Sequence, residues 1–223
     1  MVIDAYAQLE IIAQEGKELA HVKAVKKEVE LDYLKTDVMD LIAESLEGVS
    51  RVKRIVQDLR DFSHVDESEC IWADIHKGLD STLNVANNEI KYKADVIKKY
   101  GDIPAIQCMA SQLNQVFMNL LVNAAHAIEK HGTITIKTYR ENNGIVVTIS
   151  DTGTGMPDEV KKRIFDPFFT TKEIGKGTGL GLSLSYGIIE KHSGHIDVDS
   201  TLGAGTTFKI WLPLQQETIN PVV

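Results

Sequence analysis

The sequence predicts an α+β protein in which an all-α helical hairpin precedes a two-layer α/β sandwich with a mixed sheet. Residues 1–66 contain no proline and only two glycines, and their apolar residues recur every three or four positions, as in amphipathic helices. Residues 67–216 instead combine segments of helical period with short runs of β-branched residues. Two of those runs flank Asn142-Asn143-Gly144, which is typical of a hairpin turn. Helices and hairpin strands in this order indicate a sheet covered on one face by helices.

The second half of the N-terminal segment predicts one long helix from Leu31 to Phe62. Its apolar stripe consists of Leu31, Leu34, Val38, Leu41, Val49, Val52, Ile55, Leu59 and Phe62. Apolar residues at helical spacing over residues 3–29 predict the first helix of the hairpin. Two interpretations of the remaining apolar surface stay open. We favour dimerisation into a helical bundle, and the alternative is a helical pair that packs on its own domain.

The elements of residues 67–216 follow from changes of period. The expected strands are residues 71–73, 96–100, 105–108, 133–139, 145–149, 195–200 and 207–212. The expected helices are residues 77–88, 110–130, 157–165 and 180–189. Polar and acidic residues 63–68 are expected to form a linker, and residues 217–223 a C-terminal tail.

Composition excludes several classes of protein. The net charge of −8, without a basic stripe, argues against a nucleic-acid partner. Cys70 and Cys108 do not have the spacing of a metal site and are expected to be ordinary reduced cysteines. The sequence has neither a signal-peptide pattern nor an apolar run of membrane-spanning length. We therefore expect a cytoplasmic location, which leaves open a longer parent protein anchored to the inner membrane.

A glycine run precedes the predicted helix at 180–189. Gly175, Gly177, Gly179 and Gly181 occupy alternate positions. Glycine adopts positive φ at little cost, so backbone N–H groups can converge there, and the start of a helix adds unpaired donors and a positive dipole end. The run is suited to bind the phosphates of a nucleotide, and the alternative is a flexible loop without a ligand.

Three polar residues share one strip of the predicted helix at 110–130. Asn119, Asn123 and His126 follow one another at spacings of four and three. An asparagine amide oxygen is a hard, neutral ligand that suits Mg²⁺, which is bound by a few protein oxygens together with phosphates and water. The alternatives are surface or helix-end asparagines and a solvated or core histidine.

Two further motifs flank this chemistry. Asp151-Thr-Gly153-Thr-Gly155 follows a β-branched strand, so its carboxylate could accept a hydrogen bond from an exocyclic amine beside a flat ring, although a bare turn would use the same residues. Residues 165–172 combine aromatic residues, two threonines and Lys172 just before the glycine run. They could be core aromatics, but their position suggests a hinged lid whose lysine meets a phosphate.

Taken together, these motifs resemble the catalytic domain of sensor histidine kinases, in the ATPase superfamily that includes gyrase, Hsp90 and MutL. The similarity rests on Asn119-Leu-Leu-Val-Asn123-Ala, Asp151-x-Gly153-x-Gly155, Phe165 to Lys172, Gly177-Thr-Gly-Leu-Gly-Leu182 and Gly205-Thr206-Thr-Phe208. It covers roughly residues 67–214. Residues 54–63 are similar to the end of the second helix of the family's dimerisation domain.

The resemblance implies roles for individual residues. Asn123 would hold Mg²⁺, Asn119 would organise water and phosphate, and Asp151 would recognise the adenine amine. The residues implied to be catalytic are Asn119, Asn123 and Lys172, and those implied to bind ATP are His126, Asp151, Gly153, Gly155, Thr171, Gly177, Thr178, Gly179, Leu180, Gly181 and Thr206. The implied reaction transfers the γ-phosphoryl group of ATP to a histidine and then to an aspartate of a response regulator.

One departure from the family concerns the phosphoacceptor histidine. The family places it in the first hairpin helix, followed by an acidic residue and usually an Asn-Pro or Thr-Pro step. His21 is followed by Val22-Lys23-Ala24 without a nearby proline, so we expect the acceptor to lie upstream of this chain. Two other functions of the superfamily stay open, an ATP-dependent conformational clamp and an anti-sigma-type serine kinase.

Overall fold

The computed structural model describes residues 27, 30–63, 69–172 and 177–215 of the 223-residue chain. The chain divides into two units, residues 1–54 and 55–223. The predicted first helix of the hairpin, within residues 3–29, lies outside the described residues apart from Lys27. None of the helices in the described part of the chain is long and apolar enough to cross a membrane.

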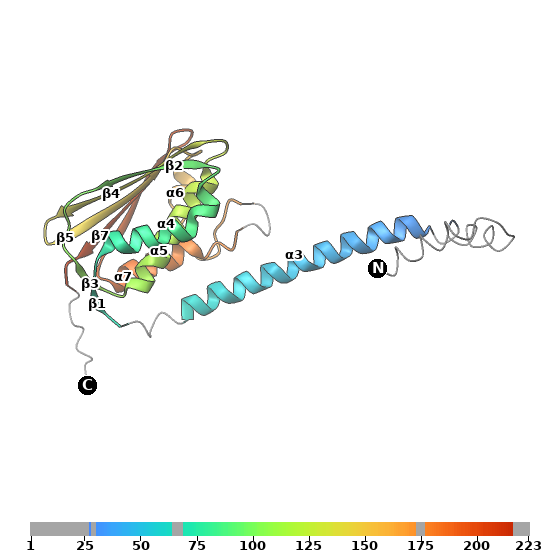
Figure 1. Ribbon diagram of the computed structural model, residues 1–223, viewed down its shortest axis with the longest axis horizontal. Coiled ribbons are helices and arrows are strands. Elements are labelled where there is room, and N and C mark those ends of the chain that lie inside the picture. The colour runs from blue at the N-terminus through green and yellow to red at the C-terminus, as the bar shows by residue number, and fades with distance from the viewer. Residues whose placement is uncertain (1–26, 28–29, 64–68, 173–176, 216–223) are drawn as a thin grey trace. The chain divides into compact units, whose positions relative to one another are not determined.

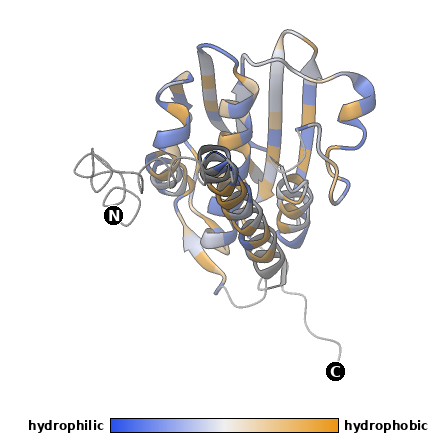
Figure 2. Cartoon of the chain, turned by 90° about the vertical axis from the view of Figure 1, so that its right-hand side faces the viewer, coloured by the Kyte–Doolittle hydropathy of each residue, from blue (hydrophilic) through white to orange (hydrophobic). Residues whose placement is uncertain are grey.

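The predicted second helix of the hairpin is confirmed as α3 (Leu31–Ser63). Apolar residues recur along its length (Figure 2). Within the single chain, members of the predicted stripe are largely exposed, with 50% of Val38, 55% of Leu41, 67% of Val49 and 59% of Val52 accessible. Because large apolar patches on soluble proteins mark interaction surfaces, this face is suited to contact another helix.

A mixed five-stranded sheet forms one layer of the second unit (Figure 1). Its strands, in spatial order, are β2 (Ala94–Tyr100), β4 (Gly132–Glu141), β5 (Gly144–Asp151), β7 (Gly205–Pro213) and β6 (His195–Thr201). β2 runs parallel to β4, and every other pair is antiparallel. A separate small sheet pairs β1 (Ile71–Ala73) with β3 (Ile106–Cys108). The predicted mixed sheet is therefore confirmed.

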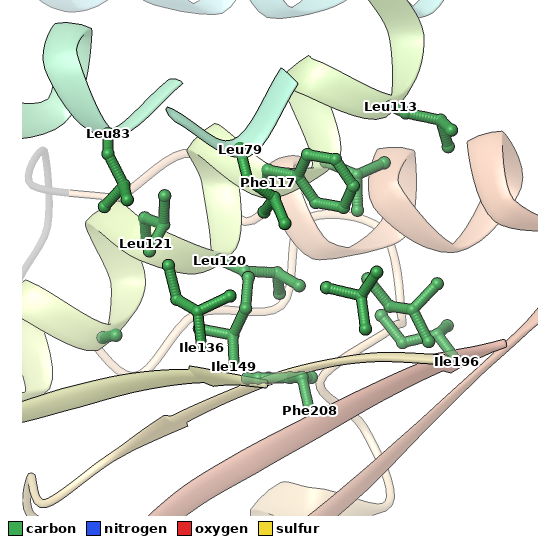
Figure 3. Packing of buried hydrophobic residues seen from close by; sticks show 14 of the residues in the cluster. Leu79, Leu83, Leu113, Phe117, Leu120, Leu121, Ile136, Ile149, Ile196 and Phe208 are labelled. Atoms are coloured by element: carbon green, nitrogen blue, oxygen red, sulfur yellow. The ribbon is translucent and has the colours of Figure 1, made fainter. Parts of the chain in front are cut away.

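Three helices cover one face of the five-stranded sheet. They are α4 (Ile75–Ile90), α5 (Ala110–Ala127) and α7 (Gly181–Lys191), and a short α6 (Asp158–Lys161) follows β5 (Figure 1). Apolar side chains fill the layer between helices and sheet: Leu79 and Leu83 from α4, Phe117, Leu120 and Leu121 from α5, and Ile136, Ile149, Ile196 and Phe208 from the strands (Figure 3). Their burial is the main source of the domain's stability. The predicted two-layer sandwich is confirmed.

Several helix boundaries differ from the prediction: α6 spans only Asp158–Lys161 instead of residues 157–165, and α7 extends to Lys191 instead of residue 189. For two further boundaries the contacts give the reason. α4 starts at Ile75 rather than at residue 77, because the carboxylate of Asp74 accepts hydrogen bonds from the backbone N–H groups of His76 and Lys77. α5 ends at Ala127 rather than at residue 130. There the carbonyl of Ala127 accepts a hydrogen bond from the N–H of Thr154 at 3.0 Å, so a segment distant in the sequence terminates the helix.

Candidate functional site

Asp151, the last residue of β5, is the buried carboxylate of the candidate site. Its Oδ1 accepts a hydrogen bond from the backbone N–H of Gly153 at 2.8 Å. Burial raises the pKa of Asp151, and the backbone N–H groups of Gly153 and Thr206 offset part of this shift. A poorly solvated carboxylate is a strong acceptor for an N–H donor of a ligand.

The two glycines after Asp151 fit closely against neighbouring backbone. A Cβ atom on Gly153 would lie 2.6 Å from the carbonyl oxygen of Ala127, at the end of α5. Gly155 has a φ of +64°, and a Cβ atom there would collide with the carbonyl of Thr201. The motif at 151–155 is therefore held between the end of α5 and the turn that joins β6 to β7.

Thr206 lies directly opposite Asp151 in the β5–β7 pair. Its Oγ1 lies 2.9 Å from Oγ of Ser200, which donates to the carbonyl of Gly205 and accepts from the N–H of Met156. Ser200 is buried and connects the predicted base-binding residues, but the sequence analysis missed it. The sequence signal for Ser200 was weak, because it is only a serine at the end of a predicted strand, on the face that points inward.

Lys172 contacts two of the three polar residues of the α5 strip. Its Nζ lies 3.4 Å from Oδ1 of Asn123 and 3.0 Å from Nδ1 of His126. Because an ammonium group only donates hydrogen bonds, Nδ1 of His126 accepts, and the ring is neutral with its proton on Nε2. Burial lowers the pKa of His126, and the charge of Lys172 lowers it further.

Glu89 on α4 completes this cluster. Its Oε2 lies 3.5 Å from Nε2 of His126, and its charge partly opposes the lowering of the pKa of His126. Glu89 was not predicted to belong to the site. Its position on a different helix leaves no local pattern that could relate it to His126.

Asn119 makes different contacts from Asn123, although both lie on α5. Its Nδ2 donates to the carbonyl oxygen of Gly181 at 3.1 Å and to Oγ of Ser185 at 3.3 Å. Asn119 therefore joins α5 to the first turns of α7. In the described part of the chain, Asn119 does not contact Lys172. Of the three predicted catalytic residues, Asn123 and Lys172 therefore contact each other, whereas Asn119 contacts α7.

The glycine run packs against the aromatic segment. Gly179 has a φ of +70°, and a Cβ atom on it would lie 2.6 Å from the carbonyl oxygen of Phe168. Oγ1 of Thr178 accepts from the N–H of Leu180 at 3.5 Å. The predicted residues Gly177 to Gly181 thus connect the aromatic segment to the start of α7, whereas Gly175 lies outside the described residues. Thr171 is exposed and forms no hydrogen bond within the described residues.

The oxygen atoms of the site would suit a metal ion that binds together with a nucleotide, whose phosphates supply further ligands. Where the structure describes the chain, it holds no group of three or more histidine, cysteine or carboxylate side chains that could bind a metal by themselves. The amide oxygen of Asn123 already accepts from a cationic group, the ammonium of Lys172. One or two neutral protein oxygens suit Mg²⁺ when phosphates and water supply its other ligands.

Comparison with known proteins places this site in a family. Residues 108–216 match the model of the histidine kinase-, DNA gyrase B- and HSP90-like ATPases. The chain is 47% identical over 127 residues to sensor kinase CckA of Brucella abortus, covering 50% of this chain and 13% of the relative. It is 43% identical over 140 residues to sporulation kinase E of Bacillus subtilis, covering 62% of this chain and 18% of the relative.

Similarity to sensor histidine kinase ZraS of Escherichia coli extends over 77% of this chain and 37% of that protein, at 31% identity. This chain thus spans well under half the length of these curated relatives. Among solved structures, the nucleotide-free catalytic domain of histidine kinase ThkA has a TM-score of 0.61 and 28% identity, covering 66% of this chain and 97% of that domain.

The relatives do not favour the clamp or the anti-sigma-type kinase, because the proteins compared above carry the names of sensor and sporulation kinases. The motif order, the mixed sheet covered by helices and the matched segment all agree. Residues 108–216 of this chain therefore form a domain of the histidine kinase-, DNA gyrase B- and HSP90-like ATPase family, and the relatives compared above are named as sensor, sporulation and histidine kinases.

Proposed function

We propose that this chain is the ATP-binding part of a two-component histidine kinase. It binds Mg-ATP between Asp151 at the base end and Asn123 at the phosphate end. The observation that supports this most directly is that one domain presents a buried carboxylate at a strand end and, on α5, an amide oxygen beside a histidine and a lysine. The named kinases among its relatives support the same reading.

Each end has a distinct task in this proposal. Asp151 accepts a hydrogen bond from the adenine amine, and Gly153, Gly155 and Thr206 line the base. Asn123 holds Mg²⁺, which when bound neutralises phosphate charge and orients the phosphates. Lys172 and His126 contact phosphate oxygens, and Asn119 acts on water and phosphate.

The proposed reaction needs positioning more than a nucleophile in this domain. The bond between the γ-phosphorus and its bridging oxygen breaks, a bond to an imidazole nitrogen of the acceptor histidine forms, and ADP leaves. A receiver domain of a response regulator then takes the phosphoryl group on an aspartate. Lys172, which carries a point charge, is suited to stabilise the transferring group.

We further propose that residues 1–66 form a dimerisation hairpin, residues 67–216 the ATP-binding domain and residues 217–223 a tail. The exposed stripe of α3 supports a homodimer through the N-terminal helices. A cytoplasmic location, with a parent protein anchored to the inner membrane, fits the same reading. His21 is proposed not to be the acceptor histidine, since it lacks the acceptor pattern.

Calorimetry with Mg-ADP tests the two ends. We expect Asn123→Ala and Asp151→Ala each to weaken Mg-ADP binding at least about tenfold. The first variant removes a proposed contact to Mg²⁺, and the second removes a proposed hydrogen bond from the adenine amine. Asn88→Ala, at an exposed asparagine of α4, and Asp197→Ala, at an exposed carboxylate of β6, serve as matched controls that retain affinity. Undiminished affinity in both site variants would exclude the assignment.

A further inference from the structure

We propose that Ser185 is a positioning residue that, together with the Gly181 carbonyl, holds the orientation of the Asn119 side-chain amide, and this rests on the proposed function. Ser185 lies on α7 and is fully buried, while Asn119 lies on α5 at the candidate site. A fully buried hydroxyl on a helix face requires hydrogen-bond partners. Its partners here are Gly181 and Asn119.

Counting hydrogens determines which atoms of this contact donate. Oγ of Ser185 donates its single hydrogen to the carbonyl oxygen of Gly181 at 2.8 Å. It therefore offers only lone pairs to Asn119, whose nearest amide atom lies 3.3 Å away. The same amide atom lies 3.1 Å from the Gly181 carbonyl oxygen, which also only accepts. Both neighbours require a donor, so the atom facing α7 is Nδ2.

The reversed amide would place Oδ1 against two acceptor oxygens and would leave Nδ2 without these partners. The free-energy cost of that reversal keeps Oδ1 on the side of the amide that faces away from Gly181 and Ser185, where it forms no hydrogen bond within the described residues. Asn119 then presents lone pairs, which suit Mg²⁺ or its bound water, so that its action on phosphate in the proposed function passes through the metal or that water and not through a direct N–H donor. The proposal thus assigns Asn119 to the metal-dependent part of nucleotide binding.

Ser183 shows what an ordinary helix serine does in the same turn of α7. Its Oγ donates to the carbonyl oxygen of Leu180 at 2.9 Å, so it also bonds back to the preceding turn. Unlike Ser185, it has no hydrogen bond to Asn119. Ser183→Ala is therefore a matched control that removes a similar hydroxyl and back-bond without changing the surroundings of the Asn119 amide.

The first experiment measures ADP binding by calorimetry, with Mg²⁺ and with the metal chelated. We expect Ser185→Ala to weaken Mg-ADP binding about fivefold, the effect of one hydrogen bond, and to leave metal-free ADP binding unchanged. Ser183→Ala should match the wild type in both conditions. In an Asn119→Ala background, Ser185→Ala should have no further effect, because its action passes through Asn119. Equal losses in both backgrounds would overturn the proposal.

The second experiment needs no nucleotide. The Asn119 side-chain N–H₂ signals in a ¹⁵N-correlated NMR spectrum, assigned by their loss in Asn119→Ala, should shift in Ser185→Ala and stay in place in Ser183→Ala. Unshifted signals in Ser185→Ala would contradict the hydrogen-bond assignment. Absence of ADP binding by the wild type would instead refute the proposed function, so the two failures are distinguishable.

Discussion

His192, directly after α7, shows how one buried side chain connects two helices. It is fully buried. Its Nδ1 donates to the carbonyl of Ile188 at 2.7 Å, and its Nε2 accepts from the N–H of Met109, at the start of α5, at 3.1 Å. The ring must therefore be neutral, because a protonated Nε2 cannot accept. Burial lowers the pKa of His192, and the Ile188 carbonyl offsets part of this effect.

This pKa predicts an acid-sensitive domain. Between the lowered pKa of the folded state and the ordinary value of 6.5, the unfolded chain binds a proton at His192 that the folded chain does not. Its stabilising contribution is therefore complete above that ordinary value and is lost as the pH falls below it. Urea unfolding from about pH 8 to about pH 5 should show this loss.

A histidine substitution separates this effect from general acid unfolding. His192→Gln should lower the free energy of unfolding by about 1–3 kcal/mol at neutral pH, because buried partners lose their hydrogen bonds. Its free energy of unfolding should also depend less on pH in the acidic range. An unchanged pH dependence in His192→Gln would contradict the prediction.

Residue-level chemistry was predictable where it depended on a local pattern. Asn119, Asn123 and His126 share a face because helical spacing requires it. The contact of Lys172 with two of them was not predicted, because its charge was assigned to a phosphate. Glu89, Ser185 and Ser200 were not found, because each acts on a residue brought near by tertiary folding. The sequence pattern around a serine or glutamate is the same whether or not tertiary folding brings a functional residue next to it.

At the level of elements, the type of each strand and helix was easier to predict than its ends. Helix ends depend on partners: Asp74 caps α4, and Thr154 meets the last turn of α5. The antiparallel β4–β5 pair followed from the turn signal at Asn142-Asn143-Gly144. The pairing of strands that are distant in the sequence did not follow, because the period of a strand does not indicate its neighbour. That β2 joins β4 in parallel, whereas the other neighbours are antiparallel, was therefore not derivable.

The exposed stripe of α3 predicts a dimer in solution. Because a lone helix would leave these apolar side chains in water, light scattering at micromolar concentration should report twice the chain mass. Val38→Glu and Val52→Glu should shift the protein toward monomer. Ser50→Glu adds the same charge outside the stripe and should leave the mass unchanged. A monomeric wild type would exclude the model.

At the scale of the whole molecule, the proposed division of labour predicts phosphorylation in trans. With γ-labelled ATP, this chain should bind nucleotide without acquiring stable label. A separate fragment that carries the acceptor helix should become labelled, and acid should remove that label because phosphohistidine is acid-labile. Acid-labile label on this chain that disappears in His21→Gln would identify His21 as the acceptor and refute the proposal that His21 is not phosphorylated.

The hydrogen bond between the Ala127 carbonyl and the 151–155 motif connects the two ends of the proposed site. α5 carries Asn119, Asn123 and His126, and its last carbonyl is bonded to the segment that follows Asp151. In the proposed site, this single helix thus fixes the distance between the adenine end and the metal end, because each residue along a helix adds a fixed rise. Nucleotides would then be selected by length as well as by base, and an inserted residue in α5 would misplace one end relative to the other.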